Sequence, residues 1–368
     1  MVEKIKAVGL NDKGELGVKY VEKPPMGSDE VLVRPTAVAP CTSDIHAFFG
    51  EDTITEDLGK LVLGHEAIGV IVEAGEDVKD FKVGDKVVIP CTTPDWNCEA
   101  AQLGCHINAT ADDGYDMYVQ DMLTGIKYPN TKMGVFCELI NVSQADLNLA
   151  HHPEDVSVES ALMVTDMVTT GFTGAENAKI ETGDTVAVLG IGPVGLMAVA
   201  GAAIMGAGRI FAVGSRPICT ELAREYGATD IIDYHDGDTI QQILEATDMK
   251  GVDATIIAGG NNDIFIDAMN ITRPSGNISN INMISKGDTI PLPVDAFAFG
   301  LADKTIRSSL CLGGRRRAEQ LLKMVKYGRV DPSKLITHKF HGFEAIVDAL
   351  LMMKDKPRDL VKPIVYLD

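Results

Sequence analysis

After Asp184 the chain alternates short apolar runs with amphipathic stretches, a pattern typical of strands that alternate with helices. Helices are predicted at Ile218–Tyr226 and Thr239–Ala246. Strands are predicted at Val186–Leu189, Ile210–Val213, Asp230–Asp233, Ala254–Ala258, Ile278–Ile281 and Thr305–Ser308. This βαβ alternation predicts a parallel, doubly wound sheet.

The N-terminal part has a different pattern, in which Gly and Pro separate alternating or apolar runs. It predicts a barrel-like or partly open β-domain. Its strands are expected at Ile5–Leu10, Leu16–Glu22, Glu30–Val38, Ala67–Glu73 and Lys86–Ile89. Residues 92–130 are irregular and polar, so loops or short helices are expected there. Val156–Met163 leads into a helix that is expected to continue through Asp166.

The C-terminal tail follows Gly313-Gly314 and contains two helical stretches, Arg315–Tyr327 and Phe343–Lys354, and a final apolar run, Pro363–Leu367. This tail is too short for a domain of its own. We therefore expect it to return to the N-terminal unit.

The segment Thr185–Arg216 combines a strand, a glycine-rich turn, a helix and a second strand. Its turn spells G-x-G-x-x-G, in the residues Gly190, Ile191, Gly192, Pro193, Val194 and Gly195. In a dinucleotide site the first glycine makes the tight turn, the second lets the backbone approach a pyrophosphate, and the third lets helix and strand pack closely. The pyrophosphate lies at the helix N-terminus, where the dipole favours negative charge.

Two other interpretations of this segment stay open at this point. One is a plain glycine-rich turn. The other is a membrane helix, because residues 185–208 carry no charge and are long enough to span a bilayer. Six glycines and a proline inside the run, with strands on both sides, favour the dinucleotide site.

Charge and cysteine usage limit the classes of partner and compartment. The 368 residues include 53 acidic and 33 basic ones, a net charge of −20, which argues against nucleic acid and anionic membranes as partners. No targeting segment is expected, because residues 1–10 lack a long apolar signal region. Seven irregularly spaced cysteines suit a reducing compartment, so a cytoplasmic protein is expected.

Candidate metal ligands occur in the first half of the chain, where Cys41 lies 24 residues before His65, which is followed by Glu66. A thiolate, an imidazole and a carboxylate are all accepted by zinc. No two of them form a compact zinc signature, so a buried thiol and a hydrogen-bonded core histidine are the alternatives.

The segment Gly64-His65-Glu66-x-x-Gly69-x5-Gly75-x-x-Val78 resembles the zinc signature of medium-chain alcohol dehydrogenases. The resemblance covers essentially the whole chain and extends to the NADP-dependent, tetrameric secondary-alcohol dehydrogenases. Its motifs are Ala39–Asp44, Pro90–Trp96, Asp166–Phe172 and Gly214–Arg216. It implies an α/β fold with a GroES-like β-rich catalytic domain, residues 1–167 and 312–368, and a Rossmann NADP-binding domain, residues 168–311.

The resemblance implies one catalytic zinc per chain, held by Cys41, His65 and Asp166, where many relatives have cysteine in place of the aspartate. Glu66 is expected as a fourth ligand that can leave. No structural zinc is expected, because the cysteines of the corresponding lobe lack close spacing. Free thiols are the default there, and a metal site is the alternative, at Cys98, Cys105 and His106.

Three residues near Cys41 resemble the family's catalytic machinery. Ser43 is placed to hydrogen-bond the substrate oxygen, His46 to end a proton relay, and Asp44 to orient His65. The alternatives are a turn or capping serine, a surface or packing histidine, and a helix N-cap.

The second strand of the dinucleotide segment ends in Gly214-Ser215-Arg216, without the acid that binds the ribose of NAD. Ser215 and Arg216 can bind a 2′-phosphate, so NADP(H) is the expected cofactor. The alternative for Arg216 is a solvated loop charge. By resemblance, Tyr234 is a further 2′-phosphate contact, and Asn282 and Lys356 lie near the cofactor.

The implied function is zinc-assisted hydride transfer between NADP(H) and secondary alcohols, ketones or aldehydes, in a homotetramer. The alternatives are a zinc-free NADPH quinone or enoyl reductase, a zinc polyol dehydrogenase, and a non-catalytic cofactor-binding protein. Two aromatic residues usual in the substrate pocket are replaced by Ile126 and Met283, so bulkier substrates than acetone are expected. The pocket residues are Cys91, Ile126, Met167, Met283, Leu310 and Cys311.

Overall fold

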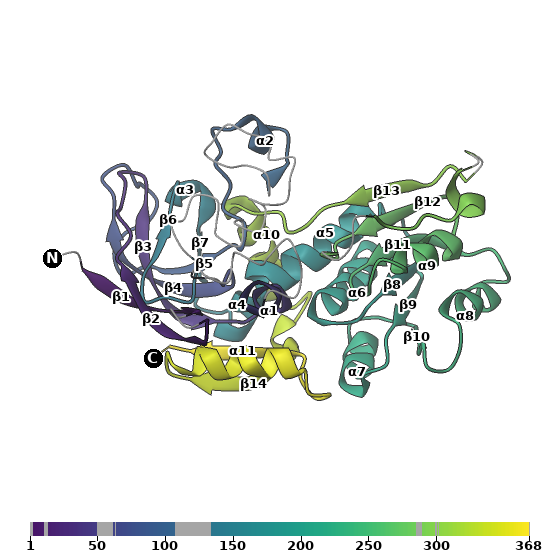
Figure 1. Cartoon of the computed structure of the whole chain (residues 1–368). Helices are drawn as coiled ribbons and strands as arrows, with labels where there is room; N and C mark the ends of the chain where they lie inside the picture. Colours follow the sequence, from purple (N-terminus) through teal and green to yellow (C-terminus); the bar gives the residue numbers. More distant parts are fainter. Residues whose placement is uncertain are drawn as a thin grey trace. The chain divides into compact units, whose positions relative to one another are not determined.

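The computed structural model describes residues 3–10, 14–49, 62, 64–106, 134–284, 289–298, 300 and 302–367. The chain divides into two compact units (Figure 1). Unit 1 comprises Met1–Thr169 and Leu312–Asp368, and unit 2 comprises Thr170–Cys311.

Unit 2 is built on a six-stranded parallel sheet, in the order β10-β9-β8-β11-β12-β13 (Figure 1). The strands are β8 (Thr185–Leu189), β9 (Arg209–Val213), β10 (Asp230–Ile232), β11 (Val252–Ile257), β12 (Thr272–Asn280) and β13 (Thr305–Ser308). The helices are α5 (Thr169–Asn177), α6 (Pro193–Met205), α7 (Pro217–Glu225), α8 (Thr239–Ala246), α9 (Ile264–Ile271) and the π-helical turn η4 (Val294–Ala298). Every strand overlaps a predicted one, and the doubly wound parallel sheet is confirmed.

The strand order places a ligand site at the centre of this sheet. From β8 the chain builds outward through β9 to β10, and from β11 it builds the other way through β12 to β13. Right-handed crossovers therefore put α6 and α7 on one face and α9 on the other. The order reverses between β8 and β11, and parallel sheets bind ligands at the carboxyl ends of strands at such a point.

The uncharged run from 185 to 208 forms a strand and a helix. It is divided between β8 and the 13-residue α6, so the membrane-helix alternative is wrong for this segment. No helix in the part of the chain that the structure describes is long and apolar enough to cross a membrane.

Unit 1 contains a hairpin and a seven-stranded, mostly antiparallel sheet in the order β14-β15-β3-β4-β5-β7, with β6 paired to β3. The strands are β1 (Lys4–Leu10), β2 (Leu16–Glu22), β3 (Val31–Val38), β4 (Ala67–Ala74), β5 (Lys86–Ile89), β6 (Ile140–Val142), β7 (Ala150–His151), β14 (Ile336–His341) and β15 (Lys362–Tyr366). The helices are α1 (Thr42–Phe49), α2 (Glu99–Gln102), α3 (Ala145–Asn148), α4 (Val158–Met163), α10 (Arg315–Lys326), the 3₁₀ turn η5 (Pro332–Leu335) and α11 (Ala345–Asp355). The β-rich N-terminal domain is confirmed.

Two features of unit 1 position its functional side chains. The C-terminal strand β15 pairs with β3 in the N-terminal sheet, so the tail brings Lys362 back to the N-terminal residues. Helix α4 continues into the π-helical segment η3 (Val164–Val168), whose five residues are all buried. The wider turn of η3 carries Asp166, and π-helical segments are frequent at functional sites.

Candidate functional site

Four potential metal donors from three separate segments of unit 1 lie together. Cys41 precedes α1, His65 and Glu66 precede β4, and Asp166 lies in η3. One donor atom from each lies within 4.8 Å of the others. Cys41 is half-buried, and the other three are buried. The fold therefore joins ligand candidates that no compact sequence spacing connects.

The two nitrogens of His65 face different partners. Its Nδ1 lies 3.5 Å from Oδ1 of Asp44, and its Nε2 lies 3.3 Å from Oδ2 of Asp166 and 3.8 Å from Oε1 of Glu66. A carboxylate beside Nδ1 favours the tautomer that carries its proton there, which leaves the Nε2 lone pair for a metal. The ring is thus turned so that Nε2 faces the other donors.

Asp44 connects the two segments that carry the first donors. Its carboxylate accepts hydrogen bonds from the backbone N–H of Cys41, at 2.8 Å, and of Gly64, at 3.2 Å. Asp44 is the third residue of α1, and a side chain at this position commonly accepts from the residue before the helix. A capping contact and the contact with His65 therefore coexist in one fully buried carboxyl group.

Lys362, which the sequence pattern did not single out, contacts this cluster from β15. Its ammonium donates a hydrogen bond to Oε1 of Glu66, and neither residue is more than 1% exposed. Burial lowers the pKa of Lys362, but the nearby anionic donors raise it by more, so the net shift is upward and the ammonium stays charged. The sequence signal is a lysine directly before the apolar terminal run Pro363–Leu367.

The charges of the cluster fit a divalent cation. Burial raises the pKa of Glu66, and the charges of Cys41 and Asp166 raise it further, which outweighs the opposing charge of Lys362. Three acidic donors thus share one lysine, so the cluster is short of positive charge. In addition, Oε2 of Glu66 is buried without a hydrogen-bond partner among the described residues. A set of thiolate, imidazole and carboxylate donors suits zinc.

The expected relay residues, Ser43 and His46, both lie on α1 and are half-buried. Cys98 is buried against Ala100 and Ala101, and Cys105 is exposed.

The expected substrate-pocket residues are divided between the two units. Cys91 and Met167 are buried in unit 1. Met283, Leu310 and Cys311 belong to unit 2, and Ile126 lies outside the described residues.

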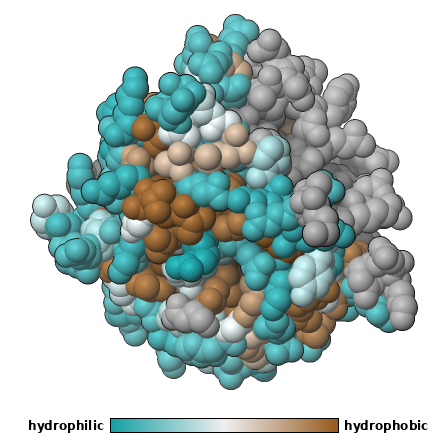
Figure 2. Space-filling model, turned by 90° about the vertical axis from the view of Figure 1, so that its left-hand side faces the viewer, coloured by the Kyte–Doolittle hydropathy of each residue, from teal (hydrophilic) through white to brown (hydrophobic). Residues whose placement is uncertain are grey.

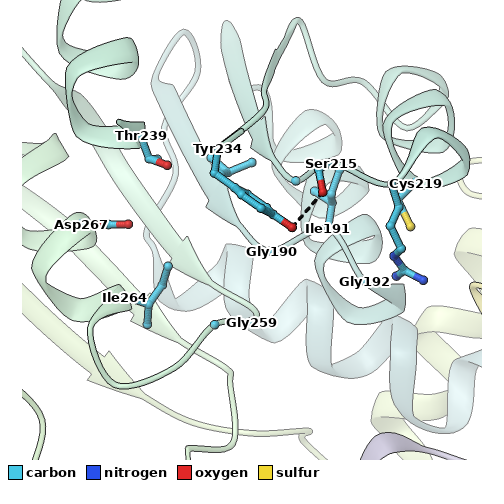
Figure 3. Close-up of a pocket in the computed structure, with 14 residues that line it drawn as sticks. Gly190, Ile191, Gly192, Ser215, Cys219, Tyr234, Thr239, Gly259, Ile264 and Asp267 are labelled. Carbon is cyan, nitrogen blue, oxygen red and sulfur yellow. Dashed lines mark hydrogen bonds between the residues drawn. The ribbon is translucent and has the colours of Figure 1, made fainter. Parts of the chain in front are cut away.

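A cavity of about 440 Å³ opens in unit 2 at the carboxyl ends of β8, β9 and β11 (Figure 3). It is lined by Gly190, Ile191, Gly192, Val213, Gly214, Ser215, Arg216, Cys219, Tyr234, Thr239, Gly259, Gly260, Ile264 and Asp267. Cys219, Thr239, Ile264 and Asp267 were not predicted, because they lie on ordinary helical patterns. The pocket coincides with the point where the strand order reverses.

The three glycines of the turn have different surroundings. Gly190 has φ of +92°, which favours glycine, and a Cβ at Gly195 would lie 1.8 Å from the carbonyl oxygen of Gly190. A Cβ at Gly192 would meet no atom within 4 Å. The first and third glycines are therefore required by the fold itself, while the second leaves open space beside the N-terminus of α6, as an approaching pyrophosphate needs.

The end of β9 presents polar groups without an acid. Ser215 and Arg216 line the pocket, and Oγ of Ser215 donates a hydrogen bond of 2.8 Å to the hydroxyl of Tyr234 (Figure 3). Asn282 donates from Nδ2 to the carbonyl oxygen of Gly260, at 3.1 Å, and so lies beside the pocket. Lys356 is exposed at the end of α11 in unit 1.

The chain matches known families and proteins over nearly its whole length. Residues 27–153 match the alcohol dehydrogenase GroES-like domain, and residues 193–326 match the zinc-binding dehydrogenase family. The NADP-dependent isopropanol dehydrogenase of Thermoanaerobacter brockii is 52% identical over 99% of this chain and 100% of its own. That of Entamoeba histolytica is 49% identical over 99% and 96%.

Solved structures of similar fold include zinc-dependent alcohol dehydrogenases. The alcohol dehydrogenase 2 of Streptococcus pneumonia, in its apo form, has a TM-score of 0.85 and 28% identity, with 99% of both chains covered. An alcohol dehydrogenase from Thermus sp. ATN1 has a TM-score of 0.83 and 26% identity, over 99% of this chain and 100% of its own. Together with the donor cluster and the pocket at the carboxyl ends of β8, β9 and β11, these matches show that the chain belongs to the zinc-binding medium-chain alcohol dehydrogenase family.

Proposed function

We propose that the chain is an NADP-dependent secondary-alcohol dehydrogenase, which interconverts secondary alcohols and ketones and also acts on aldehydes by zinc-assisted hydride transfer. The observation that carries this proposal is the buried cluster of Cys41, His65, Glu66 and Asp166 in unit 1. Zinc-free reductases of the same superfamily lack such a donor set. The isopropanol dehydrogenase of T. brockii, at 52% identity, supports the choice of secondary alcohols.

In the proposed site, Cys41, His65 and Asp166 hold one zinc ion, and Glu66 is a displaceable fourth ligand. When bound, zinc supplies a Lewis acid for the alcohol or carbonyl oxygen, and the nicotinamide supplies or accepts the hydride. Asp44 holds the Nδ1 side of His65. Lys362 holds Oε1 of Glu66, which also lies 3.8 Å from Nε2 of His65, and Oε2 has no hydrogen-bond partner among the described residues.

The proton of the alcohol needs a path to water, and α1 carries two candidates. Ser43, two residues after Cys41, is proposed to hydrogen-bond the substrate oxygen. His46 is proposed to pass the proton to solvent, since imidazole exchanges protons near neutral pH.

For the cofactor, we propose that residues 190–195 bind the pyrophosphate. Ser215, Arg216 and Tyr234 are proposed to bind the 2′-phosphate, because the end of β9 lacks the acid that an NAD site uses. Asn282, beside the pocket, and Lys356 are proposed as further cofactor contacts.

We propose that residues 1–167 and 312–368 form the catalytic domain and residues 168–311 the cofactor domain, with one zinc per chain. The proposed enzyme is cytoplasmic and homotetrameric. Two observations support an assembly: β13 is an edge strand with mostly exposed residues, and Figure 2 shows hydrophobic side chains gathered in patches on one face.

The substrate pocket is proposed to accept larger ketones than acetone, because Ile126 and Met283 stand where aromatic side chains are usual. Flexible aliphatic walls adapt to different shapes. Turnover of propan-2-ol is compared with that of longer and aromatic secondary alcohols. A strict preference for propan-2-ol contradicts this substrate proposal alone.

The proposed function is tested by zinc analysis and initial rates on the purified enzyme. Acetone and acetophenone are offered as ketones, sorbitol as a polyol and a quinone as the substrate of a zinc-free reductase, each with NADP(H) and NAD(H). We expect about one zinc per chain and ketone reduction with NADPH that far exceeds that with NADH. Full activity without zinc, or a preference for the quinone or the polyol, would overturn the proposal.

A further inference from the structure

The nucleotide pocket contains a carboxylate that the proposed function does not use. Asp267 lies in the first half of α9, is half-buried and lines the pocket. Figure 3 shows it with Thr239 and Ile264 on one side of the pocket, while Ser215 and Ile191 lie on the other. The acid is therefore separated from the group proposed to bind the 2′-phosphate.

Within the described part of the chain, the Asp267 carboxylate has no hydrogen bond and no basic partner. Burial raises its pKa, and the charges of Asp238 and Asp263 add to that rise. A half-buried carboxylate that has lost water without gaining a donor is unfavourable for the protein alone. A ligand that donates a hydrogen bond to the Asp267 carboxylate would remove this cost.

The chemistry of the pocket indicates which part of the ligand faces Asp267. The glycine turn and the end of β9 take the phosphates, and a phosphate beside Asp267 would be repelled. The remaining wall combines the apolar Ile264 with Thr239 and Asp267, which suits the face and edge of a nucleotide base. The edge of adenine carries an exocyclic amine, a neutral hydrogen-bond donor.

We propose that Asp267 accepts a hydrogen bond from the exocyclic amine of the adenine of NADP(H), and thereby selects the base. The inference rests on the proposed function, because it takes NADP(H) as the ligand. Ile264 packs against the base, and Asp267 reads its edge. Asp267 is thus a specificity residue, remote from the hydride-transfer chemistry.

The test compares NADPH with its deamino analogue, in which a carbonyl replaces the amine. Dissociation constants are measured from nicotinamide fluorescence on the intact enzyme. The wild type is expected to bind the analogue about tenfold more weakly, the size of a hydrogen bond to a charged group. Asp267→Ala is expected to weaken NADPH by about the same factor and to bring the ratio of the two constants close to one.

Two further variants separate base recognition from a structural role. Asp263→Ala removes the same charge one turn earlier on the chain, from an exposed residue outside the pocket lining, and is expected to keep the wild-type ratio. Asp267→Asn retains an acceptor oxygen and is expected to restore part of the discrimination. The preference of Asp267→Ala for NADPH over NADH should stay unchanged, since Ser215 and Arg216 are untouched.

The outcomes distinguish this inference from the proposed function. A wild type that binds NADPH tightly but does not discriminate against the analogue overturns this inference and leaves the proposed function standing. An equal loss of both nucleotides in Asp267→Ala shows a structural role and also overturns it. A wild type that binds neither nucleotide overturns the proposed function and this inference together.

Discussion

Asp166 contributes a carboxylate to the donor cluster, and zinc accepts either a carboxylate or a thiolate as a ligand. A carboxylate and a thiolate carry the same charge, so we predict that Asp166→Cys retains zinc. Asp166→Asn keeps the shape but loses the charge. Its affinity for zinc is expected to fall by at least roughly 10- to 100-fold, which is the loss seen when a residue that only hydrogen-bonds to a metal ligand is mutated.

Zinc per chain after dialysis against a graded chelator series measures this effect without recourse to turnover. Asp and Asn have nearly the same shape, so the variant is expected to fold. Melting curves recorded by circular dichroism on each sample separate a loss of zinc from a loss of folded protein. Equal zinc retention by Asp166→Asn and the wild type would show that Asp166 is not a ligand.

Lys362 and Glu66 form an ion pair in which both side chains are buried. Removal of one partner leaves the other as a buried group without its counter-charge. We predict that Lys362→Met lowers the free energy of unfolding of the zinc-free enzyme by about 3–5 kcal/mol. Lys339→Met is the matched control, because Lys339 pairs with Glu159 at 2.6 Å but is 54% exposed. Exposed pairs contribute about 0–1 kcal/mol.

Denaturant unfolding with chelator present gives both values. The double variant Lys362→Met/Glu66→Met should recover most of the lost stability, because it removes both charges together. A small and equal loss in Lys362→Met and Lys339→Met would show that the buried pair is no more important to the fold than the surface one.

At the scale of elements, two glycines of the turn are expected to have different roles: Gly195 is needed for folding, and Gly192 for binding of the cofactor. We predict that Gly195→Ala lowers the melting temperature, because its Cβ would lie 1.8 Å from the carbonyl oxygen of Gly190. Gly192→Ala has open space and φ of −72°, so its melting temperature should match the wild type. Its methyl group nevertheless blocks the approach of the pyrophosphate, and NADPH should bind at least about tenfold more weakly.

Thermal unfolding and NADPH titration on the same samples check both variants. Gly201→Ala serves as a control in the same helix, because Gly201 lies outside the pocket lining and its Cβ would lie 3.1 Å from Cβ of Ala175 and 3.4 Å from Cα of Phe172, a much milder contact than that at Gly195. If Gly192→Ala binds NADPH as tightly as the wild type, the pyrophosphate does not lie on this turn.

Most strands were predicted because each depends on a local period, although β6, β7 and β14 were missed. Strands β2, β5 and β13 have the predicted bounds, and the helix after Val156 does continue through Asp166, although in π-helical form. Contacts between distant segments have no local period. Lys362 lies 296 residues from Glu66, and no spacing rule predicts that β15 returns to β3 with a buried ammonium.

The site shows the same division. The glycine motif and Ser215–Arg216 were found because the residues of each group are adjacent in the sequence. Cys41 and His65 needed a family resemblance to be joined. Asp267 was missed because an acid in the first turns of a helix is ordinary on dipole grounds, and only the pocket shows that it lacks a partner.

At the scale of the molecule, the proposed tetramer must overcome a net charge of −20 on every subunit. Unit 2 offers an apolar surface for this purpose, since Val294 is 60% exposed and Ile290, Leu292 and Phe297 are 37–41% exposed. The edge strand β13 adds unpaired backbone groups, which natural proteins usually cover. We predict that Val294→Glu shifts the enzyme toward smaller species, because it places a charge on this surface.

Light scattering after size exclusion measures the mass, and salt provides an independent test of the cause. Because like charges on the subunits repel, raising the salt from about 0.01 to 0.15 M shortens the screening length from roughly 30 to 8 Å and should strengthen assembly. Met249→Glu, on an exposed turn of unit 2, adds the same charge elsewhere and should leave the mass unchanged. A wild type that is a monomer at every salt concentration would contradict the proposed assembly. Equal dissociation of Val294→Glu and Met249→Glu would contradict an interface at Val294, because the position of the added charge would then make no difference.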